Sequence, residues 1–173
     1  MKKIVGFLIV TFLMLALLFV VASAETTVDL LAGQDIKAGT VTVSYDGGVL
    51  CVTYETIDGW ELVETHLAIA TSLEGIPQTK KGNPIPGKFT YSMEHDPVVM
   101  EYTYEIDLEW VSGTELYIAA QAEIQKAVLD EFDAPTYDDE GNQIFQTETG
   151  WGEGSEFADD RNWAMYFTFT VEL

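Results

Sequence analysis

The chain has 173 residues, with 29 acidic and eight basic side chains, so its formal net charge is −21 at pH 7. A field of this sign repels phosphate groups, which excludes nucleic acid and anionic membrane surfaces as favourable partners. It suits cations, calcium above all, or serves only to keep the protein soluble.

The N-terminus has the pattern of a secretory signal peptide. Two lysines precede an apolar run over residues 4–21, and an Ala-Ser-Ala sequence ends at Ala24. This pattern predicts a helical signal peptide over residues 1–24, and cleavage would leave residues 25–173 as a single secreted domain. That domain would have no membrane attachment and would be free or held at the cell surface by non-covalent binding. The alternative is a retained anchor, because the run lies at the lower edge of the roughly 17–25 residues that span a bilayer.

Apolar and polar residues alternate from residue 41 onward, which predicts strands. Residues 41–45 and 49–56 flank an Asp-Gly-Gly turn and form a natural hairpin. A second Asp-Gly turn leads into residues 60–70, where Leu67 and Ile69 lie on one face and His66 on the other. Cys51 is the only cysteine, so no intrachain disulfide can form. It lies in a strand pattern.

The rest of the chain also favours strands. Residues 71–88 combine prolines and glycines without a period and predict a long loop. Strand patterns follow at 89–93, 98–106, 115–129 and 162–171, the last of these being the clearest. We therefore expect an all-β fold, a two-sheet antiparallel β-sandwich of about eight or nine strands, Ig-like or jelly-roll-like.

Aromatic residues near the C-terminus raise two alternatives. Trp151 lies between two glycines in a turn-rich run. It could stack on sugar rings from an exposed loop, or it could fold back with Phe157 to plug the open end of the sandwich. The candidate ligand contacts are Trp151, Trp60, Tyr137, Glu153 and Asn162.

Two acidic clusters could bind calcium, which takes six to eight oxygen ligands. The first cluster comprises Asp130, Asp133, Asp138, Asp139 and Glu140, and the second comprises Glu153, Glu156, Asp159 and Asp160. Neither has the spacing of an EF-hand loop. The first also reads as an ordinary hairpin turn, with Gly141 at the left-handed position.

No catalytic residue is assigned. Glycoside hydrolysis needs two carboxylates at a fixed separation, and the acids are so many that no pair is distinguished. The chain has no nucleophile elbow, and its two histidines lack the spacing of a zinc site.

Two blocks carry a family resemblance. Residues 65–91 (THLAIATSLEGIPQTKKGNPIPGKFTY) and 149–171 (TGWGEGSEFADDRNWAMYFTFTV), with ELYIAAQAEI between them, resemble a group of secreted or cell-surface β domains of bacteria and archaea. A histidine strand, a G-N-P-x-P-G loop and a closing G-W-G-x-G…N-W-x-x-Y-F segment recur in that group. The resemblance covers most of residues 31–171 and implies an extracellular domain. It carries no assigned activity, so no site residue is transferred from it.

These observations favour a non-catalytic secreted or cell-surface interaction module that binds polysaccharide or a surface protein, with Ca2+ as a candidate cofactor. The alternative is a self-assembling structural subunit that pairs its sheet edges. A glycoside hydrolase or other hydrolase is the third interpretation.

Overall fold

The computed structural model describes residues 25–107, 112–158 and 162–172. The predicted signal peptide therefore lies outside the described residues. Within those ranges, no helix is long and apolar enough to cross a membrane.

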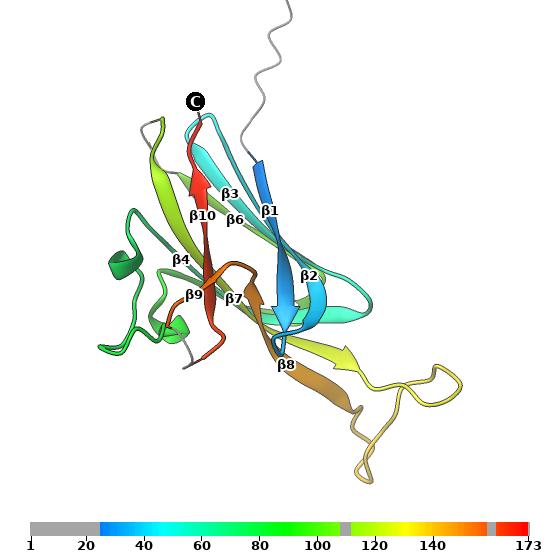
Figure 1. Cartoon of the computed structure of the whole chain (residues 1–173). Coiled ribbons are helices and arrows are strands. Elements are labelled where there is room, and N and C mark those ends of the chain that lie inside the picture. The colour runs from blue at the N-terminus through cyan, green and yellow to red at the C-terminus, as the bar shows by residue number, and fades with distance from the viewer. Residues whose placement is uncertain (1–24, 108–111, 159–161, 173) are drawn as a thin grey trace, which may run out of the picture.

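The described chain consists of strands and connecting loops (Figure 1). The strands are β1 (Glu25–Ala32), β2 (Ile36–Asp46), β3 (Val49–Thr56), β4 (Trp60–Ala70), β5 (Tyr91–Val99), β6 (Glu101–Asp107), β7 (Glu115–Ala127), β8 (Phe145–Gly152), β9 (Ser155–Glu156) and β10 (Met165–Thr170). Two single 3-10 turns, η1 (Leu73–Gly75) and η2 (Pro86–Lys88), lie in the long connection between β4 and β5.

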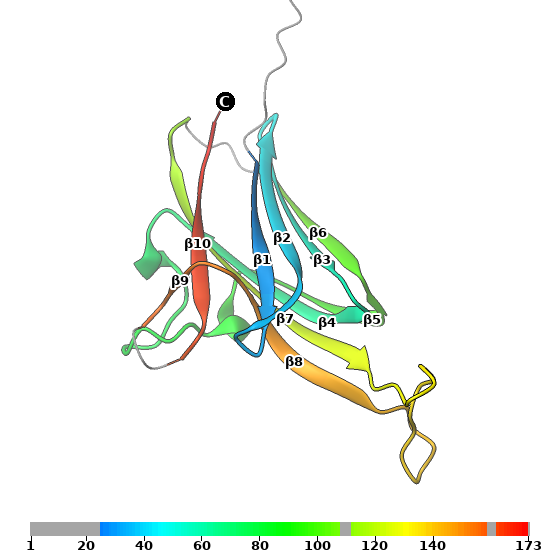
Figure 2. The same cartoon turned by 45° about the vertical axis from the view of Figure 1, so that its right-hand side comes forward.

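All ten strands belong to one antiparallel sheet, in the order β5-β4-β7-β8-β1-β2-β3-β6, with β10 beside β7 and β9 beside β10. Only Met100 separates β5 from β6, so one bent segment pairs with β4 over its first half and with β3 over its second. This connection brings the two ends of the strand order together and makes the sheet nearly barrel-shaped (Figures 1 and 2). The all-β antiparallel class is confirmed, whereas its division into two separate sheets is not.

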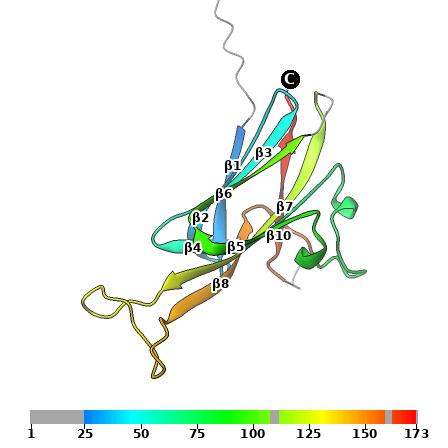
Figure 3. The ribbon, with the colours of Figure 1, turned by 180° about the vertical axis from the view of Figure 1, so that it is seen from behind.

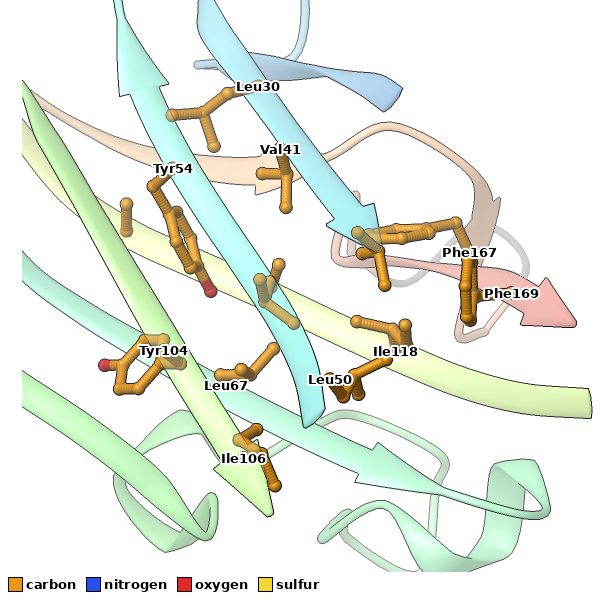
Figure 4. Packing of buried hydrophobic residues seen from close by; sticks show 14 of the residues in the cluster. Leu30, Val41, Leu50, Tyr54, Leu67, Tyr104, Ile106, Ile118, Phe167 and Phe169 are labelled. Atoms are coloured by element: carbon orange, nitrogen blue, oxygen red, sulfur yellow. The ribbon is translucent and has the colours of Figure 1, made fainter. Parts of the chain in front are cut away.

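The main core fills the inside of the rolled sheet (Figure 4). Alternation places one face of each strand inward, as expected for strands with one buried face. On β2 the inward residues are Val41, Val43 and Tyr45. The principal residues of this core are Leu30, Val41, Val43, Tyr45, Leu50, Val52, Tyr54, Trp60, Leu62, Leu67, Tyr104, Ile106, Leu116, Ile118, Ile124, Phe167, Phe169 and Val171.

A second core lies on the outer face of β4 and β7. Small residues there, Ala68 and Ala119, are covered by Ile76 and Phe89 from the β4–β5 connection. The strand β7 is therefore buried on both faces of its middle, which explains its continuous apolar run. The buried members of this second core are Ala68, Ile76, Phe89, Ala119, Trp151, Phe157, Ala164 and Met165.

Strand limits differ from the sequence predictions at both ends of the chain. The strand β1 precedes the first predicted strand, and β8 occupies residues predicted to be turn-rich. The last strand begins at Met165, and Trp163 precedes it, half-buried against the second core. His95 lies buried on β5.

Candidate functional site

Trp151 lies on β8, and its side chain is only 5% exposed. Its ring centroid is 6.4 Å from that of Phe89 and 6.4 Å from that of Phe157, with both pairs in edge-to-face orientation. Such pairs are a favourable arrangement for buried aromatic rings. Of the two alternatives for Trp151, the exposed stacking platform is therefore not found, and the indole packs in the second core with Phe157.

The glycines around Trp151 are required by close packing and not by unusual backbone angles. A Cβ at Gly152 would lie 2.9 Å from Cε1 of Phe167. A Cβ at Gly154 would collide with the backbone carbonyl of Tyr166. Neither glycine has a positive φ angle. The G-W-G-x-G sequence thus lets β8 and the following turn pass directly against β10.

Asn162 joins the two distinctive loops. Its Nδ2 donates a hydrogen bond of 2.7 Å to Oδ1 of Asn83, in the G-N-P-x-P-G loop. Its Oδ1 accepts a hydrogen bond of 3.0 Å from the backbone N–H of Ala164. Because both ends of the amide are engaged within the chain, the contact expected between Asn162 and a ligand is replaced by a structural one.

Trp60 is also a core residue. Its side chain is 3% exposed, and Nζ of Lys126 lies 6.0 Å from the centroid of its ring. A ligand cannot stack on this indole, so the expectation of a ligand contact at Trp60 is wrong. Trp60 begins β4, at the first residue of the predicted strand, and its ring lies in the main core.

The second acidic cluster lies beside β9. Glu153 and Glu156 are exposed, and the backbone N–H of Glu153 donates to the carbonyl of Asp29. Asp159 and Asp160 lie outside the described residues. Across the described ranges, no group of three or more histidine, cysteine, aspartate or glutamate side chains is arranged to hold a metal ion. Calcium binding remains a prediction.

The first acidic cluster lies at the end of a long arm. The strands β7 and β8 pair from Gln121–Trp151 to Ala127–Phe145, and β7 stays paired with β4 as far as Lys126. Beyond these pairs, the connection between β7 and β8 extends away from the rest of the sheet (Figures 1 and 3). Residues 128–144, which we call the arm tip, connect them. Three backbone hydrogen bonds form a ring at its base: Val128 N–H donates to Ile144, Ile144 N–H to Thr136, and Thr136 N–H to Val128, at 3.0, 2.9 and 2.9 Å.

This ring divides the arm tip into two lobes of equal length. In the first lobe, Oδ1 of Asp130 accepts hydrogen bonds of 2.8 and 3.0 Å from the backbone N–H groups of Phe132 and Ala134. In the second lobe, Oδ1 of Asp138 accepts equivalent bonds of 2.9 and 2.8 Å from Glu140 and Asn142. The two aspartates therefore shape turns, a role in which Asp is favoured.

The lobes also match in their backbone angles. Asp133 has a φ of 59° and Gly141 a φ of 84°, at corresponding places in the two turns. The hydrogen bond from the backbone of Asn142 contributes most to lowering the pKa of the Asp138 carboxyl. The sequence carries a trace of this duplication, LDEFDAPT followed by YDDEGNQI, which pattern analysis of single strands does not detect.

The arm tip concentrates exposed apolar side chains. The described residues include eight exposed large apolar side chains, and five of them lie on the arm tip. The exposed fractions are 81% for Phe132, 59% for Tyr137, 46% for Leu129, 40% for Ile144 and 37% for Val128. Tyr137 was among the predicted contacts, whereas Phe132, the most exposed of the set, was not.

A buried polar group lies between β4, β5 and β6. The Thr65 hydroxyl is 2.8 Å from the Tyr104 hydroxyl and 3.2 Å from Nε2 of His95. Burial raises the pKa of Tyr104 to about 12 and lowers the pKa of His95. These three side chains satisfy one another inside the sheet, so their role is to join the strands.

One further pair of polar atoms lacks a partner. Nδ1 of His66 and Oε1 of Gln121 are buried without a hydrogen bond to the described chain. These residues are register partners on β4 and β7. Nε2 of His66 lies 3.1 Å from Oε1 of Glu64, and Nε2 of Gln121 donates to Oε1 of Glu123 at 2.8 Å. Each side chain is thus engaged at one end only.

Comparison of the chain with protein-family models, with curated proteins and with solved structures found no match.

Proposed function

We propose that the chain is a non-catalytic interaction module, secreted or held at the cell surface, and that its arm tip is the contact surface. The observation that carries this proposal is the gathering of five exposed large apolar side chains on the arm tip. Clustered apolar exposure is costly in water and marks surfaces that are covered by another molecule.

The internal order of the arm tip supports the proposal. A loop that only connects two strands needs few residues, and a hairpin connection usually has two to five. This one has a hydrogen-bonded ring at its base and two turns closed by aspartate side chains. Such construction presents side chains in a defined arrangement, which lowers the entropic cost of binding.

Secretion is part of the same proposal. The basic start, apolar run and small-residue site at the N-terminus support export. The high acid content suits an extracellular surface that stays soluble and that can attract Ca2+. Calcium-assisted binding is therefore part of the proposal.

The experiment replaces residues 129–143 by Asn-Gly. Val128 N–H already donates to the carbonyl of Ile144, so these two residues form a suitable last pair for a two-residue turn. The full chain would be expressed with its own leader and recovered in its processed form. Binding of the labelled protein to cells that produce it, and to their isolated polysaccharides, would be measured with calcium and with a chelator.

We expect the shortened variant to keep its melting temperature and its circular dichroism spectrum and to lose binding. Equal binding by a folded shortened variant would disprove the proposal. Loss of binding in chelator would show that calcium takes part, and unchanged binding there would remove calcium from the proposal.

A second candidate function is self-assembly, favoured by one observation on β1. This strand pairs with β2 along its whole length but with β8 only at Leu30–Ala32. Within the described ranges, the outer edge of its first half carries no ladder, and an open edge can pair with another chain. This alternative would be supported if the purified processed protein forms polymers and the Thr27→Pro variant does not.

A further inference from the structure

We infer that the arm tip inserts into an apolar pocket of a protein partner and that lysine and arginine side chains border this pocket. The inference rests on the proposed function and specifies its partner. It starts from Phe132, the most exposed apolar side chain of the arm tip, which projects from the rest of the sheet (Figures 1 and 3).

Phe132 lies in a turn and is exposed to solvent. The backbone N–H of Asp133 donates to the carbonyl of Asp130 at 3.2 Å, which closes a β-turn with Phe132 at its third position. The side chain there is 81% exposed. A single ring projecting from a turn offers little area to the flat face of a sugar polymer. It gains most when it enters a concave apolar site, where its whole surface leaves water.

The turn is ordered before binding. Oδ1 of Asp130 accepts hydrogen bonds from the N–H groups of Phe132 and Ala134, at 2.8 and 3.0 Å. The ring of hydrogen bonds at Val128, Thr136 and Ile144 fixes the lobe to the arm. The backbone therefore needs little further ordering on binding, as expected of a surface that is complementary to a defined pocket.

The charge of the arm tip determines what surrounds that pocket. Residues 128–144 include six acidic residues and no lysine, arginine or histidine. Asp130 and Asp138 use their carboxylates to cap turns, and the other four face water without a salt bridge in the described structure. Acids beside a buried apolar contact are best compensated by cations on the partner, which also speed association.

The same charge disfavours a second copy of this chain as the partner. The full sequence has a net charge of −21, so two copies repel one another at long range. Lys126, the basic residue nearest the arm tip in sequence, lies over the ring of Trp60. A cationic pocket on a different protein fits the arm tip better than its own surface does.

The experiment places a photoreactive benzoylphenylalanine at position 132 and, as a control, at position 36. Ile36 is 44% exposed and begins β2, which β1 separates from β8 in the strand order. The full chain is expressed in the cells that produce it, irradiated, and its adducts are separated and mapped by mass spectrometry.

Two variants separate the apolar and the charged contributions. Phe132→Ser removes the ring. A four-site variant (Glu131→Gln, Asp133→Asn, Asp139→Asn, Glu140→Gln) removes the uncapped charges and keeps the two capping aspartates. Its control removes four acids from the outer surface of β2, β3 and β6 (Asp46→Asn, Glu55→Gln, Glu101→Gln, Glu105→Gln). All are compared at about 0.05 and 0.5 M NaCl, where screening differs strongly.

We expect an adduct with another protein from position 132 and none from position 36. Its mapped residues should be apolar, with lysine or arginine around them. Phe132→Ser and the four-site variant should each lower affinity for the mapped protein by about tenfold or more, and the control variant should not. High salt should weaken binding of the native chain and leave the four-site variant little changed.

Four outcomes would overturn the inference. An adduct between two copies of the chain would identify self-association. A polysaccharide adduct, or no protein adduct although the shortened variant has lost cell binding, would leave the proposed function standing with a different partner. A protein adduct at a site that is acidic or neutral would refute the charged border. Failure of the proposed function itself is distinct, because the shortened variant would then bind as the native chain does.

Discussion

The side-chain amide of Asn162 donates a 2.7 Å hydrogen bond to the side chain of Asn83, 79 residues earlier in the chain. This bond connects the two segments that cover the outer face of β4 and β7. One carries Phe89 and the other carries Phe157, and both rings contact Trp151. The distinctive loops of the sequence therefore build a second core together.

We predict that Asn162→Ala lowers the free energy of unfolding by about 1–2 kcal/mol, because a part-buried hydrogen bond is lost and Asn83 Oδ1 is left without its donor. Urea unfolding of the single and double variants with Asn83→Ala would measure the coupling between the two residues. Asn142→Ala, at the exposed arm tip, is the matched control and should cost less. Additive effects of the two single changes would contradict the predicted link.

We predict that Gly154→Ala is strongly destabilising, by about 2–4 kcal/mol, because the new methyl group would collide with the backbone carbonyl of Tyr166. Gly87→Ala is the control, since a Cβ there meets no atom within 4 Å. Its effect should stay within about 0.5 kcal/mol. Thermal unfolding of both variants tests the difference, and equal melting temperatures would show that the contact at Gly154 can relax.

Two aromatic substitutions should differ in their effect on stability, because one removes a core residue and the other a surface residue. We predict that Trp151→Ala lowers the free energy of unfolding by about 3–5 kcal/mol, because it empties a buried site between Phe89 and Phe157. Phe132→Ser should leave stability nearly unchanged, since its side chain is 81% exposed. Denaturant titration measures both. A large loss of stability in Phe132→Ser would show that the ring packs within the arm tip.

Acid should destabilise the fold partly through His95. Burial lowers its pKa in the folded chain below the ordinary 6.5, so the unfolded chain binds the proton more readily. The contribution of neutral His95 is complete above pH 6.5 and is lost as the pH falls through the lowered folded pKa. We predict that His95→Gln reduces the loss of stability between pH 7.5 and 5.5, as measured by urea unfolding at each pH. An unchanged slope would show that His95 is not responsible.

The pattern of the sequence predicted part of the candidate surface. Tyr137 and the first acidic cluster do lie together on the arm tip, because neighbours in a turn stay neighbours in space. Phe132 was missed because a single aromatic residue among acids has no periodic signal. The sequence left the position of Trp151 open and did not predict the burial of Trp60, for a different reason. Glycines and turns beside an aromatic ring do not reveal whether another segment will cover it.

By itself, the sequence determined the all-β class, most of the strands and the long connection between β4 and β5. Alternation, turn residues and prolines act over a few positions, and these local preferences survive in the fold. The tertiary structure alone decided that β1 and β8 are strands, that β5 and β6 join the two ends of the sheet, and that Trp151 is buried. Each of these features depends on pairing or packing between segments that are distant in sequence, such as the bond between Asn83 and Asn162. The free energy of such contacts cannot be read from the pattern of neighbouring residues.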